Sequence, residues 1–178
     1  MNSVTKKILK IISNTLTIFV VSAAFLLHGF QLFGLKPYSV LSGSMESIYP
    51  IGSLIYVSKT NPDDLKVNDI ITFNMPGGTI GTHRIIELVP DEDNSNVIKF
   101  RTKGDENEIA DGTLVESNSI IGKPLFCIPL LGYLATYIAV PPGKYVALTV
   151  AAALILIEII ISIILADKSN AKTKPKQK

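Results

Sequence analysis

Cysteine is almost absent from this sequence, since Cys127 is the only one in 178 residues. A single thiol cannot form an intramolecular disulfide, so the chain must fold by packing alone. A cysteine nucleophile needs a base and stabilisation of its thiolate, and the surrounding segment LFCIPLLG supplies neither. We therefore expect Cys127 to belong to the apolar core.

Basic residues are scarce in the middle of the chain. Between positions 35 and 144, nine lysines and arginines stand against 13 aspartates and glutamates, which leaves a net charge of −4. This balance excludes a basic patch for nucleic acid, so no nucleic-acid partner is expected. The overall net charge of +2 comes from lysines near the two ends.

Charged residues are also missing from two long segments. None occurs from Ile11 to Leu35, and Glu158 is the only one from Tyr145 to Ala166. A helix of about 20 apolar residues crosses a bilayer, and a helix that is apolar on every side suits lipid. We predict membrane spans at residues 11–34 and 145–166. The alternative for the first segment, a cleaved signal peptide, is disfavoured because its apolar core exceeds roughly 15 residues and no A-x-A-like site follows.

Lysines flank both predicted spans. Those before the first are Lys6, Lys7 and Lys10, and those after the second are Lys168, Lys172, Lys174, Lys176 and Lys178. Because cytoplasmic flanks carry the lysine excess, we expect a multi-pass protein of the cell membrane with both termini cytoplasmic, at residues 1–10 and 167–178. Residues 35–144 would then form an extracytoplasmic domain, or a lumenal one in a eukaryotic cell. If the spans pack together, Glu158 lies by depth near Thr15 or Thr17.

The segment between the spans has the pattern of β structure. Runs rich in Ile, Val, Phe and Tyr alternate with turn-forming clusters such as NPDD, MPGG and PDEDNSN. The runs are SLIYV, DIITF, HRIIELV, NVIKFRT and SIIGKPLFCI. They predict a compact antiparallel sheet or small barrel over residues 35–144. No helical period of useful length occurs there, so we expect no helix between the spans.

Two serines stand just after the first span, in VLSGSMESIYPIG: Ser42 and Ser44. A catalytic serine needs a base, a group that orients the base, and donors for the oxyanion. The chain has two histidines. His28 lies inside the first apolar segment, where we expect an interfacial or helix-packing residue, so His83 in GTHRII is the candidate base.

An acidic run, TKGDENEIADG, follows a predicted strand and offers four candidates to orient a histidine: Asp105, Glu106, Glu108 and Asp111. The sequence also allows a merely solvated loop. A calcium loop is not expected, because Ile109 and Ala110 stand where an EF-hand needs an oxygen ligand and a glycine.

Four blocks in order, VLSGSMES, GTHRII, TKGDENEIAD and IIGKPLFCIPLLGYL, lie within or between the two apolar segments. Together they resemble the type I signal peptidases, and specifically the endoplasmic-reticulum, archaeal and SipW-like branch that uses a serine and a histidine. The resemblance covers roughly residues 30–166. It implies a mainly β protein: a compact antiparallel catalytic domain of the signal peptidase type, flanked by two transmembrane helices.

The resemblance also assigns roles to residues. Ser44, which precedes a methionine, matches the nucleophile, and His83 matches the general base. Asp105 and Asp111 match the two aspartates of the acidic block; we favour Asp111 as the residue that orients His83, with Asp105 as a supporting carboxylate. Ser42 has two interpretations, an oxyanion donor or a residue that closes the turn. The family usually has a proline where this chain has Ser47, so the turn is expected to differ there.

The implied function is a membrane-bound serine endopeptidase that removes N-terminal signal peptides from exported preproteins, without metal or cofactor. Its partners would be preproteins and the lipid bilayer, and the need for accessory subunits stays open. A strand edge near YSVLSG would pair with the extended cleavage region. Two other functions remain: a non-catalytic membrane-anchored β domain that binds exported proteins or assembles an envelope complex, and a membrane serine protease of broad specificity.

Overall fold

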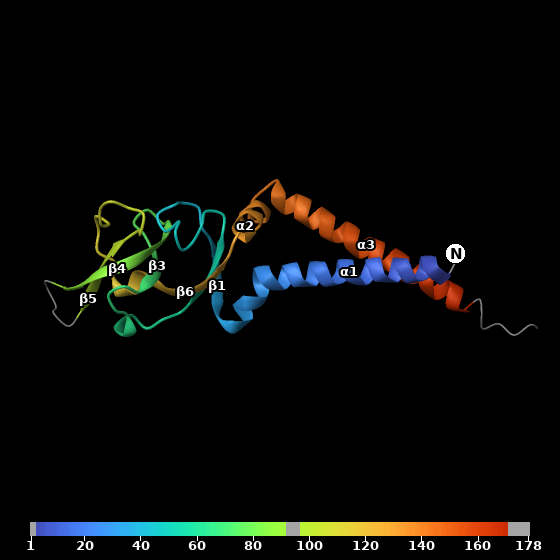
Figure 1. Ribbon diagram of the computed structural model, residues 1–178, viewed down its shortest axis with the longest axis horizontal. Coiled ribbons are helices and arrows are strands. Elements are labelled where there is room, and N and C mark those ends of the chain that lie inside the picture. Colours follow the sequence, from blue (N-terminus) through green and yellow to red (C-terminus); the bar gives the residue numbers. More distant parts are fainter. Residues whose placement is uncertain (1–2, 92–96, 171–178) are drawn as a thin grey trace, which may run out of the picture. The chain divides into compact units, whose positions relative to one another are not determined.

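The computed structural model describes residues 3–91 and 97–170. The chain divides into two units, one of residues 27–136 and one that combines residues 1–26 with 137–178. The first unit contains all the strands, and the second contains most of the two long helices α1 and α3 (Figure 1).

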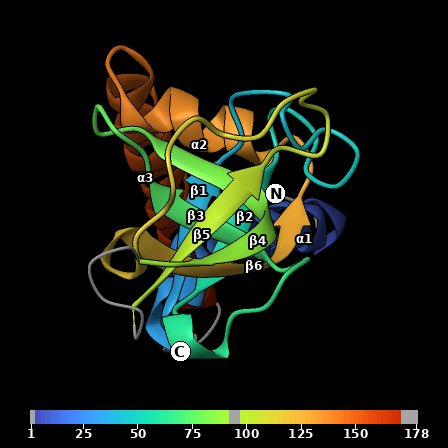
Figure 2. The ribbon, with the colours of Figure 1, turned by 90° about the vertical axis from the view of Figure 1, so that its left-hand side faces the viewer.

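Six strands form one sheet in the order β1-β2-β6-β3-β4-β5, and every pairing is antiparallel. Figure 2 labels all of these strands in a view turned by 90° from Figure 1. The strands are β1 Leu35–Ser39, β2 Leu54–Ser58, β3 Ile70–Asn74, β4 Ile80–Pro90, β5 Ile98–Lys103 and β6 Ile120–Ile128. The predicted fold, an antiparallel β unit flanked in sequence by two long apolar helices, is confirmed. Each of the five predicted runs is a strand, and β1 supplies an edge strand beside YSVLSG.

Strand β6 joins the two halves of the sheet. Its first residues pair with β3 and its later residues with β2. Gly122 lies in this crossing with a φ of 155°, and a Cβ there would come within 1.9 Å of the carbonyl oxygen of Ser58. Only glycine therefore allows the backbones of β6 and β2 to approach so closely.

Two apolar clusters hold the sheet together. The first contains Leu65, Ile71, Phe73, Ile85, Phe100 and Val115, and the second contains Met45, Tyr49, Ile55 and Val57. Burying each such side chain contributes about 1.5–3 kcal/mol. Cys127 is half-buried and packs against the second cluster, as expected for an apolar residue.

One expectation about this part of the chain is wrong: α2, Leu131–Ala139, is a helix. Its start is held against the sheet, because Tyr133 N–H donates to Gly52 O at 3.2 Å and a Cβ on Gly132 would lie 2.2 Å from Ser53 O. A helix of nine residues spans too few turns to show a clear period. Tertiary packing on the sheet therefore decided this element.

The long helices are α1, Ser3–His28, followed by a short 3₁₀ turn at Gly29–Phe33, and α3, Gly143–Asn170. Two stretches in the described part of the chain, Lys7–Phe33 and Gly143–Ile163, are long and apolar enough to span a membrane. These stretches agree in place with the predicted spans. The prediction of a cytoplasmic lysine flank at Lys172, Lys174, Lys176 and Lys178 concerns positions outside the described residues.

Helices α1 and α3 are joined by hydrogen bonds to Glu158. Ser13 Oγ and Thr17 Oγ1, four residues apart and so on one face of α1, both donate to the carboxylate of Glu158. Of the two threonines expected near Glu158, Thr17 is the one that donates to its carboxylate, and both threonine side chains are exposed.

Candidate active site

Ser44 lies in a tight turn between β1 and β2, next to a buried apolar residue. Met45 beside it is only 2% exposed and belongs to the second core cluster. Backbone N–H groups close the turn, from Glu46 to Gly43 O at 3.1 Å and from Tyr49 to Met45 O at 2.7 Å. The buried methionine thus fixes the backbone that presents the Ser44 hydroxyl.

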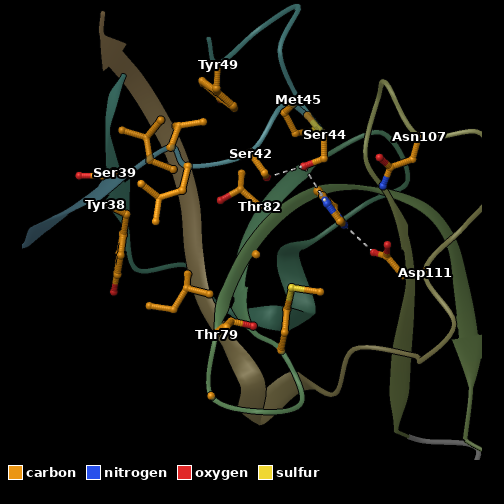
Figure 3. Close-up of a pocket in the computed structure, with 18 residues that line it drawn as sticks. Tyr38, Ser39, Ser42, Ser44, Met45, Tyr49, Thr79, Thr82, Asn107 and Asp111 are labelled. Atoms are coloured by element: carbon orange, nitrogen blue, oxygen red, sulfur yellow. Dashed lines mark hydrogen bonds and ion pairs between the residues drawn. The ribbon is translucent and has the colours of Figure 1, made fainter. Parts of the chain in front are cut away.

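His83 faces that hydroxyl from β4. Its Nε2 lies 3.1 Å from Ser44 Oγ, and its Nδ1 lies 2.6 Å from Asp111 Oδ2 (Figure 3). The His83 side chain is 9% exposed, and its ring meets the Phe73 ring edge-on. Since a carboxylate can only accept, Nδ1–H donates to Asp111, and Nε2 of the neutral ring is free to accept the Ser44 proton. This is the geometry of a nucleophile, a base and a group that orients the base.

Thr102 extends this hydrogen-bonded chain. It is fully buried on β5, and its Oγ1 donates to Asp111 Oδ2 at 2.5 Å. Thr102 is not among the site residues predicted from the sequence, although the strand pattern contains a signal for it. Phe100 and Thr102 share one face of the strand because side chains alternate, and a hydroxyl on a core-facing position needs a partner.

Asp105 pairs with Arg84, whereas Asp111 pairs with His83. Arg84 Nε donates to its Oδ1 at 2.9 Å and Arg84 Nη2 to its Oδ2 at 2.7 Å. These hydrogen bonds hold the pKa of Asp105 below its ordinary value although partial burial opposes the shift, and the same carboxylate raises the pKa of Arg84. The structure thus brings Asp111 to His83 and Asp105 to Arg84. Arg84 is not among the site residues predicted from the sequence.

The other candidates take separate positions. Ser42 Oγ lies 3.5 Å from Ser44 Oγ, while Glu106 and Glu108 are exposed on the turn after β5. His28 ends α1, where Gln31 Nε2 lies 3.5 Å from its Nδ1. Within residues 3–91 and 97–170, no group of three or more histidine, cysteine, aspartate or glutamate side chains is arranged to hold a metal ion.

A cleft of about 740 Å³ opens beside the Ser44 hydroxyl. Its walls come from the chain that leaves β1, residues 38–42, and from the β3–β4 turn and the start of β4, residues 78–83 (Figure 3). Most of the lining is apolar, and Asn107 and Asp111 contribute polar groups. A cleft along an edge strand suits an extended peptide.

The chain matches the signal peptidase, peptidase S26 family over residues 11–124, more than half of its length, and belongs to that family. Its relatives include signal peptidase I W of Bacillus subtilis, 40% identical over 90 residues, which are 50% of this chain and 46% of the relative. The signal peptidase complex catalytic subunit SEC11C of Homo sapiens is 33% identical over 128 residues, 67% of this chain and 66% of the relative. The chain thus spans about half to two thirds of these relatives, and the predicted family and branch are confirmed.

Proposed function

We propose that this protein is a membrane-bound serine endopeptidase that removes N-terminal signal peptides from exported preproteins. The observation that carries the proposal is the chain of hydrogen bonds from Ser44 through His83 to Asp111, in a member of the signal peptidase family. Ser44 is the proposed nucleophile, His83 the general base, and Asp111 the residue that orients the imidazole. Asp105 supports the site from its pair with Arg84.

The reaction follows from these positions. His83 Nε2 takes the proton of Ser44 Oγ as that oxygen attacks the scissile carbonyl carbon, and Asp111 stabilises the imidazolium. The imidazolium then protonates the departing amine and the C–N bond breaks. The mature protein departs with the new amino terminus, and the signal peptide remains bound to Ser44 as an acyl-enzyme. Water, deprotonated by the same imidazole, hydrolyses the Ser44 ester and restores both groups. The steps require no metal or cofactor.

Ser42 is proposed to help bind the oxyanion together with the backbone N–H of Ser44. Its hydroxyl, 3.5 Å from Ser44 Oγ, lies close to the atom that will carry the acyl group. Loss of such a donor lowers kcat by roughly 10²–10³-fold. A Ser42→Ala variant with this loss and an unchanged melting temperature supports the donor role, whereas a lower melting temperature with normal kcat supports turn closure.

The proposed topology brings substrate and site together. With residues 11–34 and 145–166 in the bilayer, the termini 1–10 and 167–178 are cytoplasmic and residues 35–144 are extracytoplasmic. Ser44 follows Leu35 by nine residues, so the nucleophile lies within about 30 Å of the membrane surface. A signal peptide held in the bilayer presents its cleavage site in that zone, where the edge of β1 can pair with it.

The deciding experiment is preprotein processing by the full chain. Ser44→Ala and His83→Ala are expected to abolish cleavage, and Asp111→Asn to lower it by roughly 10⁴-fold, since a wrongly held imidazole tautomer cannot act as the base. Unchanged processing by Ser44→Ala would overturn the proposal in favour of the non-catalytic binding domain. Cleavage of folded soluble proteins by the wild type would favour the protease of broad specificity.

The same assay addresses partners. The name of the relative SEC11C describes a subunit of a signal peptidase complex. Processing by the purified chain in lipid vesicles, compared with processing in crude membranes, measures whether this protein also works with accessory subunits.

A further inference from the structure

Arg84 follows the proposed base directly on β4 and makes three directed hydrogen bonds. Two go to the two oxygens of Asp105, at 2.9 and 2.7 Å, and the third goes from Nη1 to Asn68 O at 2.8 Å. The side chains of Arg84 and Asp105 are 27% and 21% exposed, so water screens this pair less than an open surface pair. The planar guanidinium therefore holds Asp105 in one orientation.

The turn at residues 104–106 contacts the backbone at Ser44 and the side chain of Met45. Glu106 N–H donates to Ser44 O at 3.0 Å, and Asp105 N–H lies 3.3 Å from Met45 Sδ. A Cβ on Gly104 would lie 2.7 Å from Ser44 O and 2.8 Å from Ser44 Cβ. The backbone of this turn is thus in direct contact with the backbone of the proposed nucleophile.

We propose that Arg84 is a positioning residue: its pair with Asp105 ties the turn at residues 104–106 to β4, and this link sets Ser44 Oγ at hydrogen-bonding distance from His83 Nε2. The inference rests on the proposed function. Successive side chains of a strand project to opposite faces. His83 of β4 therefore reaches the Ser44 hydroxyl, while Arg84 binds the turn at residues 104–106 through Asp105. Asp105 acts through this link, with both carboxylate oxygens occupied by Arg84.

A positioning role predicts a specific kinetic pattern. Misplacement of a reacting atom by about 1 Å costs roughly 10²-fold in rate, while peptide binding in the cleft is unaffected. Arg84→Met, which keeps the apolar stem, is expected to lower kcat by about 10–100-fold with KM unchanged. Arg84→Lys keeps the charge but loses the two-pronged geometry, and is expected to recover part of that loss.

A second ion pair on the same strand offers a matched control. Arg101 Nε donates to Glu87 Oε2 at 2.9 Å, which links β5 to β4 away from the cleft. Arg101→Met therefore removes an arginine pair of the same strands without touching the nucleophile turn. It is expected to keep the wild-type kcat.

The experiment measures kcat and KM for one preprotein in lipid vesicles, with thermal unfolding of every variant. The inference is supported if Arg84→Met and Asp105→Asn each lower kcat and the double variant is no slower than the worse single one. Should Arg84→Met fail to fold, Arg84→Lys against Arg101→Lys carries the same comparison. Two results overturn this inference alone, provided that Ser44→Ala is inactive. One is a wild-type kcat in the Arg84 variants, and the other is an equal loss of kcat in the Arg101 variants. Full processing by Ser44→Ala overturns the proposed function and this inference with it.

Discussion

Thr102→Val removes one hydrogen bond from the acidic end of the site and changes little else. Thr102 is fully buried, and its hydroxyl donates to Asp111 Oδ2, the oxygen that also accepts Nδ1–H of His83. Valine has nearly the same shape, so no cavity forms. A hydrogen bond to a charged group contributes about 1.5–3 kcal/mol. We expect the free energy of unfolding to fall by about that amount, and kcat to fall roughly tenfold with KM unchanged, because Asp111 then holds the imidazole less firmly.

Chemical denaturation in detergent and single-turnover processing measure the two effects. Thr102→Ser keeps the donor and is expected to keep kcat while losing about 1 kcal/mol of stability with its methyl group. Thr72 is a matched control, since it is also fully buried and its Oγ1 lies 2.9 Å from Thr82 Oγ1. Thr72→Val should lower stability without the fall in kcat. The reasoning is refuted if Thr102→Val keeps wild-type kcat, or if Thr102→Ser loses as much activity as Thr102→Val.

Three further predictions follow from other contacts. Gly104→Ala places a methyl group 2.7 Å from Ser44 O, so we expect a loss of about 1–3 kcal/mol in unfolding free energy and a slower acylation step, both absent if the turn can shift freely. Arg84 lowers the pKa of Asp105, so this pair stabilises the fold at pH values above 3.8, the ordinary pKa of the carboxyl group. That stability is lost as the pH falls through the lower pKa of Asp105 in the folded state. The drop in melting temperature between about pH 6 and pH 3 should therefore be smaller in Asp105→Asn than in wild type. Glu158→Gln should lower the melting temperature in detergent, non-additively with removal of the two α1 hydroxyl groups that it contacts, and additive losses would contradict the contact.

Local patterns determined much of this protein. Two apolar segments, one without any charge and one with Glu158 as its only charge, are long enough to predict membrane helices, and runs rich in Ile, Val, Phe and Tyr between turn clusters predict five of the six strands in the sheet. The candidate base followed from scarcity, since His28 lies in an apolar helix and His83 is the other histidine in the chain. Ser44 was chosen over Ser42 because it matches the serine before a methionine that is the nucleophile in the family the chain resembles. These features depend on residues that are close in sequence, so they can be predicted from a single amino-acid sequence.

The tertiary structure decided which distant groups meet. The acidic run offers four carboxylates within seven positions, and only the folded turn shows that Asp111 reaches His83 while Asp105 reaches Arg84. The existence of helix α2 was not predicted for a related reason, because its nine residues are held by contacts with the β2 end of the sheet. Hydrogen bonds such as these join residues 21 to 81 positions apart, as between Asp105 and Arg84 or between Tyr133 and Gly52. Their directions depend on backbone geometry that strand register and turn shape set together, which no local pattern of residue types records.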